Sequence, residues 1–547
     1  MVLGRVSRRA LLVGGWSVLG VPVLAACLGR ESKGKKKGGG SAASGGAGSG
    51  SAGASASASG SAGASGGSGQ GVTRTVSTVG ATLKVTVGPA VVSNDVMVVP
   101  LAVHLDKAGS SSPSSSGFGL DLVWNGTDRY TGADGVRLVD FDAGTVQATF
   151  KASSESDGLT DKEPDVTLHA LFKPVDASTI NVLVPESGLF EGVPVVRDGK
   201  LSEDAKKALE DVYDTESSPD PVALETFTAS VDGASDTRVT GKSVTITLAS
   251  DVLFDSDSAD LSAQADTTLK KAADQLSTYP GGQVTIVGHT DDVADDAHNQ
   301  DLSQRRAQAV SDRLGQLASM SAYSVSVSGK GESEPRVPND SDGNRQLNRR
   351  VEITLVPTQE SSTKSPTGTS KDADKGSGKG GGDLPKAEGP VAKGSEGVTV
   401  KRGGGDDKLT FVLKEVTRRG KYLVGEVKAT GGPGGTKTGP ADWLQPTQLA
   451  GSARGEEDTK LLGAVTGLSL LTAQTRYYPV DYTTAQGAHH PLSEITADNK
   501  LGDGDATTLT VVWPDTGQDT ATLDLEPATG PTRPNNPFRL TDIPIKG

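Results

Sequence analysis

The sequence has 547 residues, and its 71 glycines and 4% aromatic content leave long stretches with too little apolar surface for a packed core. This length allows about three domains joined by solvated segments. The formal charge of −14 argues against a nucleic-acid partner, because the phosphates would be repelled. The only cysteine, Cys27, excludes an intrachain disulfide and a cysteine-based metal site.

Residues 1–27 have the layout of a bacterial export signal. Basic residues precede an apolar stretch that ends at Ala26, which is too short and too often interrupted by glycine for a comfortable membrane span. The adjacent Arg8 and Arg9 resemble a twin-arginine signal. The run Leu24-Ala25-Ala26-Cys27 resembles the lipobox of bacterial lipoproteins. This resemblance implies that Cys27 is lipidated, by acyl chains such as palmitate; a plain signal peptide with an incidental cysteine is the alternative.

Two segments have the composition of tethers. Residues 28–71 begin with a lysine-rich patch and continue almost wholly as Gly, Ser and Ala, which predicts a flexible coil. The lysines suit either contact with anionic lipid headgroups or a solubilising spacer. Residues 359–398 return to Ser, Lys, Gly and Pro, and we predict a flexible linker there.

The first of two predicted β-rich domains spans residues 72–232. Ala81–Val87 alternates between apolar and polar residues, and the apolar runs Val96–Leu105, Phe118–Trp124 and Thr179–Val184 are bounded by Gly, Pro and Asn. Both patterns predict strands and favour a β-sandwich.

The second predicted β-rich domain spans residues 399–547. In the first domain Leu171-Phe172-Lys173-Pro174 leads to Thr179-Ile180-Asn181-Val182, and in the second Val512-Trp513-Pro514 leads to Thr520-Ala521-Thr522-Leu523. A duplicated module is one explanation, and the frequency of such strand pairs in β proteins is the other.

The region between them, residues 241–358, alternates strand and helix patterns. Leu261, Leu269 and Leu276 lie on one stripe of a first predicted helix, which Ser258 or Asp260 is expected to cap. A second predicted helix runs from about Asn299 to Leu317. Arg306 falls on its apolar stripe, so this side chain needs an anionic partner, either inside the protein or on a ligand, whereas Arg305 can point to water.

This region resembles the OmpA-like domain in the order and spacing of its motifs. The motifs are Phe254-Asp255, Gly288-His289-Thr290-Asp291, Asn299-x-x-Leu302-Ser303-x-x-Arg306-Ala307, Gly329-Lys330-Gly331-Glu332 and Asn348-Arg349-Arg350. The expected fold is a central two-layer α+β sandwich of β-α-β-α-β-β-like order, flanked by two β-rich, sandwich-like domains.

The resemblance implies that the domain holds the diaminopimelate side chain of the peptidoglycan stem peptide. Asp291 would bind its ammonium group and Arg306 its carboxylate. An internal Asp291–Arg306 salt bridge that only orders a loop is the alternative. The supporting peptidoglycan-binding residues expected by resemblance are Thr290, Asn299, Leu302, Ser303, Phe254, Asp255, Asn348, Arg349 and Arg350.

We therefore expect a peptidoglycan-binding lipoprotein that is not an enzyme. Neither flank shows a clustered nucleophile, base and acid, and His104, His169, His489 and His490 stand apart from any familiar metal-ligand spacing, so no catalytic residue, metal or cofactor is predicted. The alternative is a wall-targeted hydrolase or transferase with an unrecognised active site in a flank. The expected partners are peptidoglycan, the lipid bilayer through acylated Cys27, and unidentified envelope proteins. The expected location is the extracytoplasmic side of the cell membrane, with an outer-membrane placement left open.

Overall fold

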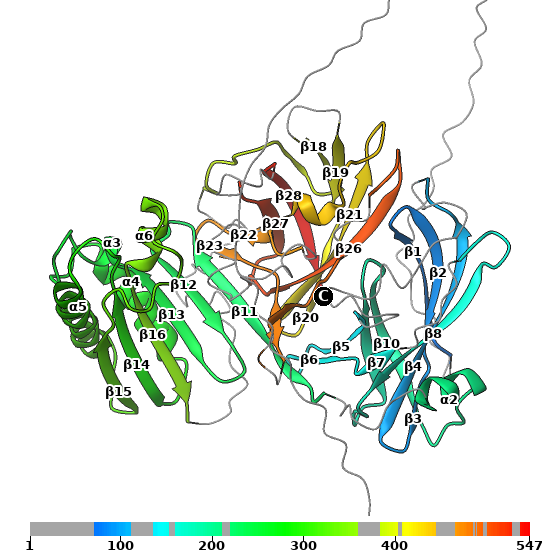
Figure 1. The fold of residues 1–547 in the computed structure, drawn as a ribbon, viewed down its shortest axis with the longest axis horizontal. Coiled ribbons are helices and arrows are strands. Elements are labelled where there is room, and N and C mark those ends of the chain that lie inside the picture. Colours follow the sequence, from blue (N-terminus) through cyan, green and yellow to red (C-terminus); the bar gives the residue numbers. More distant parts are fainter. Residues whose placement is uncertain are drawn as a thin grey trace, which may run out of the picture. The chain divides into compact units, whose positions relative to one another are not determined.

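The computed structural model describes residues 70–110, 135–152, 159–210, 219–358, 383–402, 407–444, 465–484, 487, 489–495, 500–527 and 536–547 (Figure 1). The predicted export signal with Cys27, nearly all of the first tether and the predicted strand Phe118–Trp124 lie outside these ranges. None of the helices described here is both long and apolar enough to cross a membrane.

The predicted fold class is confirmed: the chain is mainly β, with a central α/β region between β-rich regions. The predicted limits of the individual domains stay predictions. Residues 383–398, the end of the predicted linker, contain the short strand β17 (Val391–Lys393), which pairs with β28 (Phe538–Lys546) in the last β-rich region.

The first β-rich region packs two sets of strands around one apolar core. One set runs β1–β2–β4–β8, and β3 also joins β4. The other set runs β6–β5–β9–β10. Alternate side chains of β2 are buried, as the alternating pattern predicted. The bounds are β1 Val72–Thr78, β2 Ala81–Val87, β3 Ala90–Ser93, β4 Val96–Lys107, β5 Arg137–Asp140, β6 Thr145–Ala148, β7 Lys151–Ala152, β8 Asp165–Phe172, β9 Thr179–Val184, β10 Gly188–Arg197 and α2 Glu203–Glu210.

The last β-rich region follows the same plan. One set of strands runs β18–β19–β21–β26, and β20 also joins β21. The other set runs β23–β22–β27–β28. The bounds are β18 Val398–Lys401, β19 Lys408–Val412, β20 Val416–Arg419, β21 Tyr422–Gly431, η1 Pro440–Trp443, β22 Leu468–Leu471, β23 Thr475–Tyr477, β24 Asp481–Thr483, β25 His489–Pro491, β26 Ala506–Pro514 and β27 Thr520–Leu525.

The two regions share their unusual pairings as well. In each, a short strand next to the first set pairs in parallel with the last strand of the second set: β3 with β10, and β20 with β28. Each final hairpin, β9–β10 and β27–β28, carries a register shift. These shared features support a duplicated module.

The central region has two layers, with α4 and α5 packed on a mixed sheet (Figure 1). The sheet order is β12–β13–β16–β14–β15, antiparallel except for the parallel pair β14–β15. The bounds are β12 Ser235–Val239, β13 Val244–Ala249, α3 Ser250–Leu253, α4 Ala265–Leu276, β14 Gly282–His289, α5 Asp296–Leu317, β15 Tyr323–Gly329, α6 Asp342–Asn348 and β16 Arg350–Pro357.

The expected cap of the first long helix is wrong. Helix α4 begins at Ala265, beyond Ser258 and Asp260, and its first backbone N–H donates to Ser262 Oγ at 3.2 Å. Leu261 instead forms an isolated bridge with Phe254, which keeps the intervening segment out of the helix.

Strand β11 (Val222–Ser230) belongs to several pairings at once. It pairs with β12 of the central sheet, with β6 of the first β-rich region, and with β23 and β24 of the last. Strands β6 and β23 are the corresponding strands of the two modules, so β11 joins the same edge of each.

Candidate binding site in the central domain

Arg306 is buried on α5 with only 4% of its surface exposed. The helix begins at Asp296 and is capped by Asp295, whose side chain accepts from the backbone N–H of His298; Arg306 is one of its buried residues. The Arg306 guanidinium donates to the carbonyl oxygens of Ser258 (2.8 Å) and Asp255 (3.4 Å), and lies over the Phe254 ring at 5.2 Å.

The expected contrast between the two neighbouring arginines is confirmed. Arg305 has half of its side chain exposed and pairs with Asp301 one turn earlier. Burial lowers the pKa of Arg306, against the opposing effects of Asp251 and Asp257. An arginine nevertheless keeps its charge in proteins, so the buried guanidinium remains a cation.

Asp291 follows β14, where the strand ends. Its Oδ2 accepts from Arg349 Nη1 at 2.6 Å, and only 13% of its side chain is exposed. Arg349 also binds both carboxylate oxygens of Asp251, at 2.7 and 2.8 Å. These hydrogen bonds, first to Asp251 and then to Asp291, raise the pKa of Arg349. Asp251 therefore belongs to the site, although sequence reasoning did not select it.

The two key residues lie close enough to influence each other but are not paired. Asp251, Arg349 and Asp291 all affect the pKa of Arg306, so the four charges share one electrostatic neighbourhood. In the ranges described, however, Asp291 forms its ion pair with Arg349, and none joins it to Arg306. The alternative of a direct Asp291–Arg306 salt bridge is therefore not what the structure shows.

Asn299 and Ser303 fasten the surrounding loops to α5. Asn299 Nδ2 donates to the carbonyl oxygens of Asp291 and Ala294, both at 3.2 Å, and to Glu332 Oε2 at 2.6 Å. Ser303 Oγ accepts from the backbone N–H of Gly331 at 2.9 Å. Both side chains thus set the positions of loops beside Asp291.

Thr290 is fixed through its backbone, whose N–H donates to the Gly331 carbonyl at 2.9 Å. Its hydroxyl is buried and has no hydrogen-bond partner among the described residues. A buried hydroxyl without a hydrogen-bond partner lowers the stability of the fold. Such unpartnered groups are common at sites that bind a ligand.

Gly288 allows α5 to approach the sheet. A Cβ at Gly288 would lie 2.1 Å from the backbone oxygen of Ser303, which is far inside van der Waals contact. The close packing of helix on strand end is what brings Ser303 and Arg306 beside the loop of Asp291.

Three more of the predicted binding residues are buried within the domain. Asn348 is fully buried, and its side chain makes four hydrogen bonds that hold residues 336–339. Arg350 pairs with Glu352 at 2.7 Å. Leu302 is a buried residue of α5. The structure therefore groups Phe254, Asp255, Asp291, Asn299, Ser303, Arg306 and Arg349, with Thr290 beside them.

Known proteins resemble this central part of the chain. The OmpA family matches residues 253–349. Outer membrane porin F of Pseudomonas aeruginosa is 41% identical over 102 residues, which are 19% of this chain and 29% of that protein. Outer membrane protein A of Escherichia fergusonii is 39% identical over 118 residues, which are 20% of this chain and 48% of that protein. The chain thus spans less than half the length of these relatives.

Solved structures cover a similar share. The cell wall anchor of the T6SS from Pseudomonas aeruginosa is 32% identical, with a TM-score of 0.21, and covers 23% of this chain and 88% of its own. The peptidoglycan-associated lipoprotein from Burkholderia pseudomallei is 26% identical, with a TM-score of 0.17. The match covers 20% of this chain and 87% of that lipoprotein chain. The family match identifies residues 253–349 of this chain as an OmpA-family domain, which lies in the sequence between the β-rich regions.

Proposed function

We propose that this chain binds peptidoglycan without covalent chemistry, by holding the free end of diaminopimelate between Asp291 and Arg306. The observation that carries the proposal is a pair of opposite charges that are fixed by other groups and not by each other. Asp291 is held by Arg349, and Arg306 by two backbone carbonyls. The OmpA-family match over residues 253–349 supports the same assignment.

The chemistry of the ligand suits this arrangement. The free end of diaminopimelate carries an ammonium and a carboxylate on one carbon, so it needs an anion and a cation on facing sides. Arg306 has five N–H donors, of which two bind the carbonyls of Ser258 and Asp255, so others remain for a carboxylate. Asp291 accepts an ammonium group alongside its bond to Arg349.

The expected complex is weak and reversible. Hydrogen bonds to charged groups contribute about 1.5–3 kcal/mol each, and about 4 kcal/mol corresponds to a millimolar dissociation constant. Two such contacts therefore give an affinity near the millimolar range before any neighbouring contact is added.

A lipid anchor would make that affinity sufficient. We propose that Cys27 is acylated, that the protein sits on the extracytoplasmic face of a cell-envelope membrane, and that residues 28–71 span the gap to the wall. Tethering raises the effective concentration of wall sites, so modest contacts hold firmly. The β-rich regions would then present surfaces to other envelope proteins.

A sedimentation assay with insoluble peptidoglycan sacculi tests the pocket. We expect the chain without its first 27 residues to sediment with sacculi and the Asp291→Asn and Arg306→Ala variants to lose at least tenfold in affinity. The matched controls are Asp292→Asn, next in sequence and paired with Arg345, and Arg305→Ala, exposed on the same helix. Equal binding by all five proteins, each with native circular dichroism, would contradict the assignment.

The chemistry of the ligand and the absence of catalysis have separate tests. Stem peptides that contain diaminopimelate should compete for the site, whereas peptides with lysine at that position should not, because lysine lacks the second carboxylate.

Incubation with sacculi should neither release soluble fragments nor form new cross-links. The appearance of either product would favour a hydrolase or transferase instead. Cys27→Ala should abolish incorporation of labelled palmitate and release the protein from membranes.

A further inference from the structure

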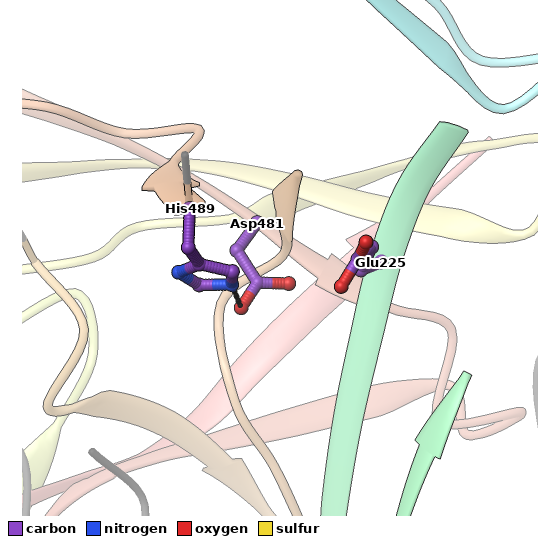
Figure 2. A group of neighbouring side chains, drawn as sticks. All are labelled: Glu225, Asp481 and His489. Atoms are coloured by element: carbon purple, nitrogen blue, oxygen red, sulfur yellow. Dashed lines mark ion pairs between the residues drawn. The ribbon is translucent and has the colours of Figure 1, made fainter. Parts of the chain in front are cut away.

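A second group of charged side chains gathers where strand β11 meets the β24–β25 hairpin, away from the central-domain site. Glu225, Asp481 and His489 each offer a ligand atom, and these atoms all lie within 4.8 Å of one another. Figure 2 shows the Asp481 carboxylate between the His489 ring and the Glu225 carboxylate. Glu225 and Asp481 are 6% and 2% exposed, and the His489 side chain is 10% exposed.

The strand register explains why these three side chains meet. Glu225 of β11 stands directly opposite Asp481 of β24 in an antiparallel pair, so both side chains point to one face. Strand β24 pairs in turn with β25, where Asp481 faces Pro491 and His489 lies two residues away. Residues two apart in a strand share a face, so His489 lies diagonally beside Asp481.

The neighbouring His490 provides an internal comparison. It lies on the opposite face, stacks on Tyr482 with ring centroids 5.4 Å apart, and places Nδ1 3.3 Å from Glu494. Glu494 in turn lies 3.6 Å from Arg137. That face combines one buried carboxylate with a histidine and an arginine, whereas the His489 face brings two carboxylates together at directly opposed positions. Like charges directly opposite each other destabilise a sheet; Arg238 offsets the charge of Glu225 here, and a bound cation would offset both carboxylates.

We propose that Glu225, Asp481 and His489 bind a divalent transition-metal ion, with a zinc-type coordination of one imidazole nitrogen and two carboxylate oxygens. Mixed nitrogen and oxygen donors favour such an ion over Mg²⁺ or Ca²⁺, which prefer oxygen donors alone. A fourth position would be left for water, as in zinc sites with three protein ligands.

The geometry needs only small movements to accept the ion. Ligand distances of about 2.0–2.2 Å in a tetrahedral site place donor atoms about 3.4 Å apart. His489 Nε2 and Asp481 Oδ2 are 2.7 Å apart and would open slightly, while no separation exceeds 4.8 Å, so the widest would close by at most about 1.4 Å.

Arg238 completes the surroundings of the proposed site. Its Nη2 and Nε both donate to the same oxygen of Glu225, Oε2, at 2.7 and 3.3 Å. The other oxygen, Oε1, thus remains for the metal, and Arg238 holds the carboxylate in orientation in the manner of an outer-shell partner. Arg238 belongs to β12, the strand that connects β11 to the central sheet.

The proposed ion would clip β11 to the β24–β25 hairpin. Because β11 also pairs with β12 of the central sheet, the metal would fasten the strand that leads into the OmpA-family domain to the last β-rich region. This role is independent of peptidoglycan binding, since none of its ligands belongs to the central-domain site.

Metal titration of the purified full-length chain, stripped with a chelator, tests the proposal. We expect one Zn²⁺ to bind per chain with a dissociation constant of about 1 µM or lower, and Mg²⁺ to bind at least 100-fold more weakly. The near-isosteric Glu225→Gln and Asp481→Asn variants and His489→Ala should each lose at least tenfold. The control is His104→Gln, which removes another histidine paired with an aspartate, Asp165, and should bind as the parent does.

A second measurement keeps the test decisive if a variant fails to fold. Co²⁺ replaces Zn²⁺ in the parent protein, and its visible spectrum distinguishes a tetrahedral site from an octahedral surface complex. An intense tetrahedral spectrum at one equivalent supports the site. A weak octahedral spectrum, zinc affinity poorer than about 100 µM, or affinity that persists in all three variants would overturn the proposal and leave a His489–Asp481 ion pair alone.

Discussion

His289 offers a direct test of the electrostatics of the central domain, because this buried histidine is predicted to make stability depend on pH. It ends β14, is 2% exposed, and neither ring nitrogen has a hydrogen-bond partner among the described residues. Burial, aided by Arg350, lowers the pKa of His289 from 6.5 to about 4, although Glu352 and Glu334 act in the opposite direction.

The sign of the effect follows from proton binding in the two states. Between pH 6.5 and about 4 the unfolded chain binds a proton at this position and the folded chain does not. Stability is therefore fully present above pH 6.5 and is lost as the pH falls toward 4. At about 1.4 kcal/mol for each tenfold change in proton affinity, the whole loss is about 3 kcal/mol.

The assay is urea denaturation at several pH values between 7 and 4. Unfolding of the central domain is followed by protease cleavage within β14 and β16. Carboxylates also titrate near the lower end, so the comparison is made with His289→Gln, which should lose about 3 kcal/mol less than the parent over this interval. The control is His298→Gln, an exposed histidine of the same domain. Identical pH profiles for the parent and His289→Gln would refute the argument that burial keeps His289 neutral.

Three further changes test the packing. Asn348→Ala removes a fully buried side chain with four hydrogen bonds, and should lower the free energy of unfolding of the central domain by about 3 kcal/mol in urea denaturation; a loss under about 1 kcal/mol would contradict its scaffold role. Gly288→Ala places a Cβ 2.1 Å from the Ser303 carbonyl oxygen, so we expect a loss of at least about 2 kcal/mol and weaker sacculus binding; parental values for both would show that α5 shifts freely. Asp524→Ala leaves buried Arg539 without its carboxylate and removes one of the two carboxylates that bind buried Arg476. It should cost about 3–5 kcal/mol in thermal unfolding of the last β-rich region, unlike an exposed control such as Asp519→Ala.

The features that depend on local periodicity could be predicted from the sequence. Helix α5 was expected to begin at about Asn299 and in fact begins at Asp296, and the division between inward Arg306 and outward Arg305 follows from a turn of about 100° per residue. The cap of α4 could not be predicted equally well. Several polar residues precede that helix, and the Phe254–Leu261 bridge, a tertiary contact, decides which one caps it.

Long-range partners could not be predicted at all. The motifs identified Asp291 and Arg349, but the ion pair between them depends on how β14 and β16 align. Asp251 reaches Arg349 only because β13, which precedes Asp251, pairs with the other side of β16. His489 likewise stands apart from other ligands in the sequence. It meets Glu225 only through the register of β11, β24 and β25, which is set by tertiary packing.

The separation of charges in the central site has an energetic consequence for binding. Had Asp291 and Arg306 been paired, a zwitterionic ligand would have had to break that pair, and most of its own electrostatic gain would have been lost. Here Arg306 is already out of water, held by carbonyls that satisfy it only in part, so the desolvation cost is met when the protein folds. A ligand carboxylate that reaches Arg306 gains a charge-assisted contact without a second desolvation of the guanidinium. The arrangement therefore favours a ligand that carries both charges over one that carries the ammonium alone.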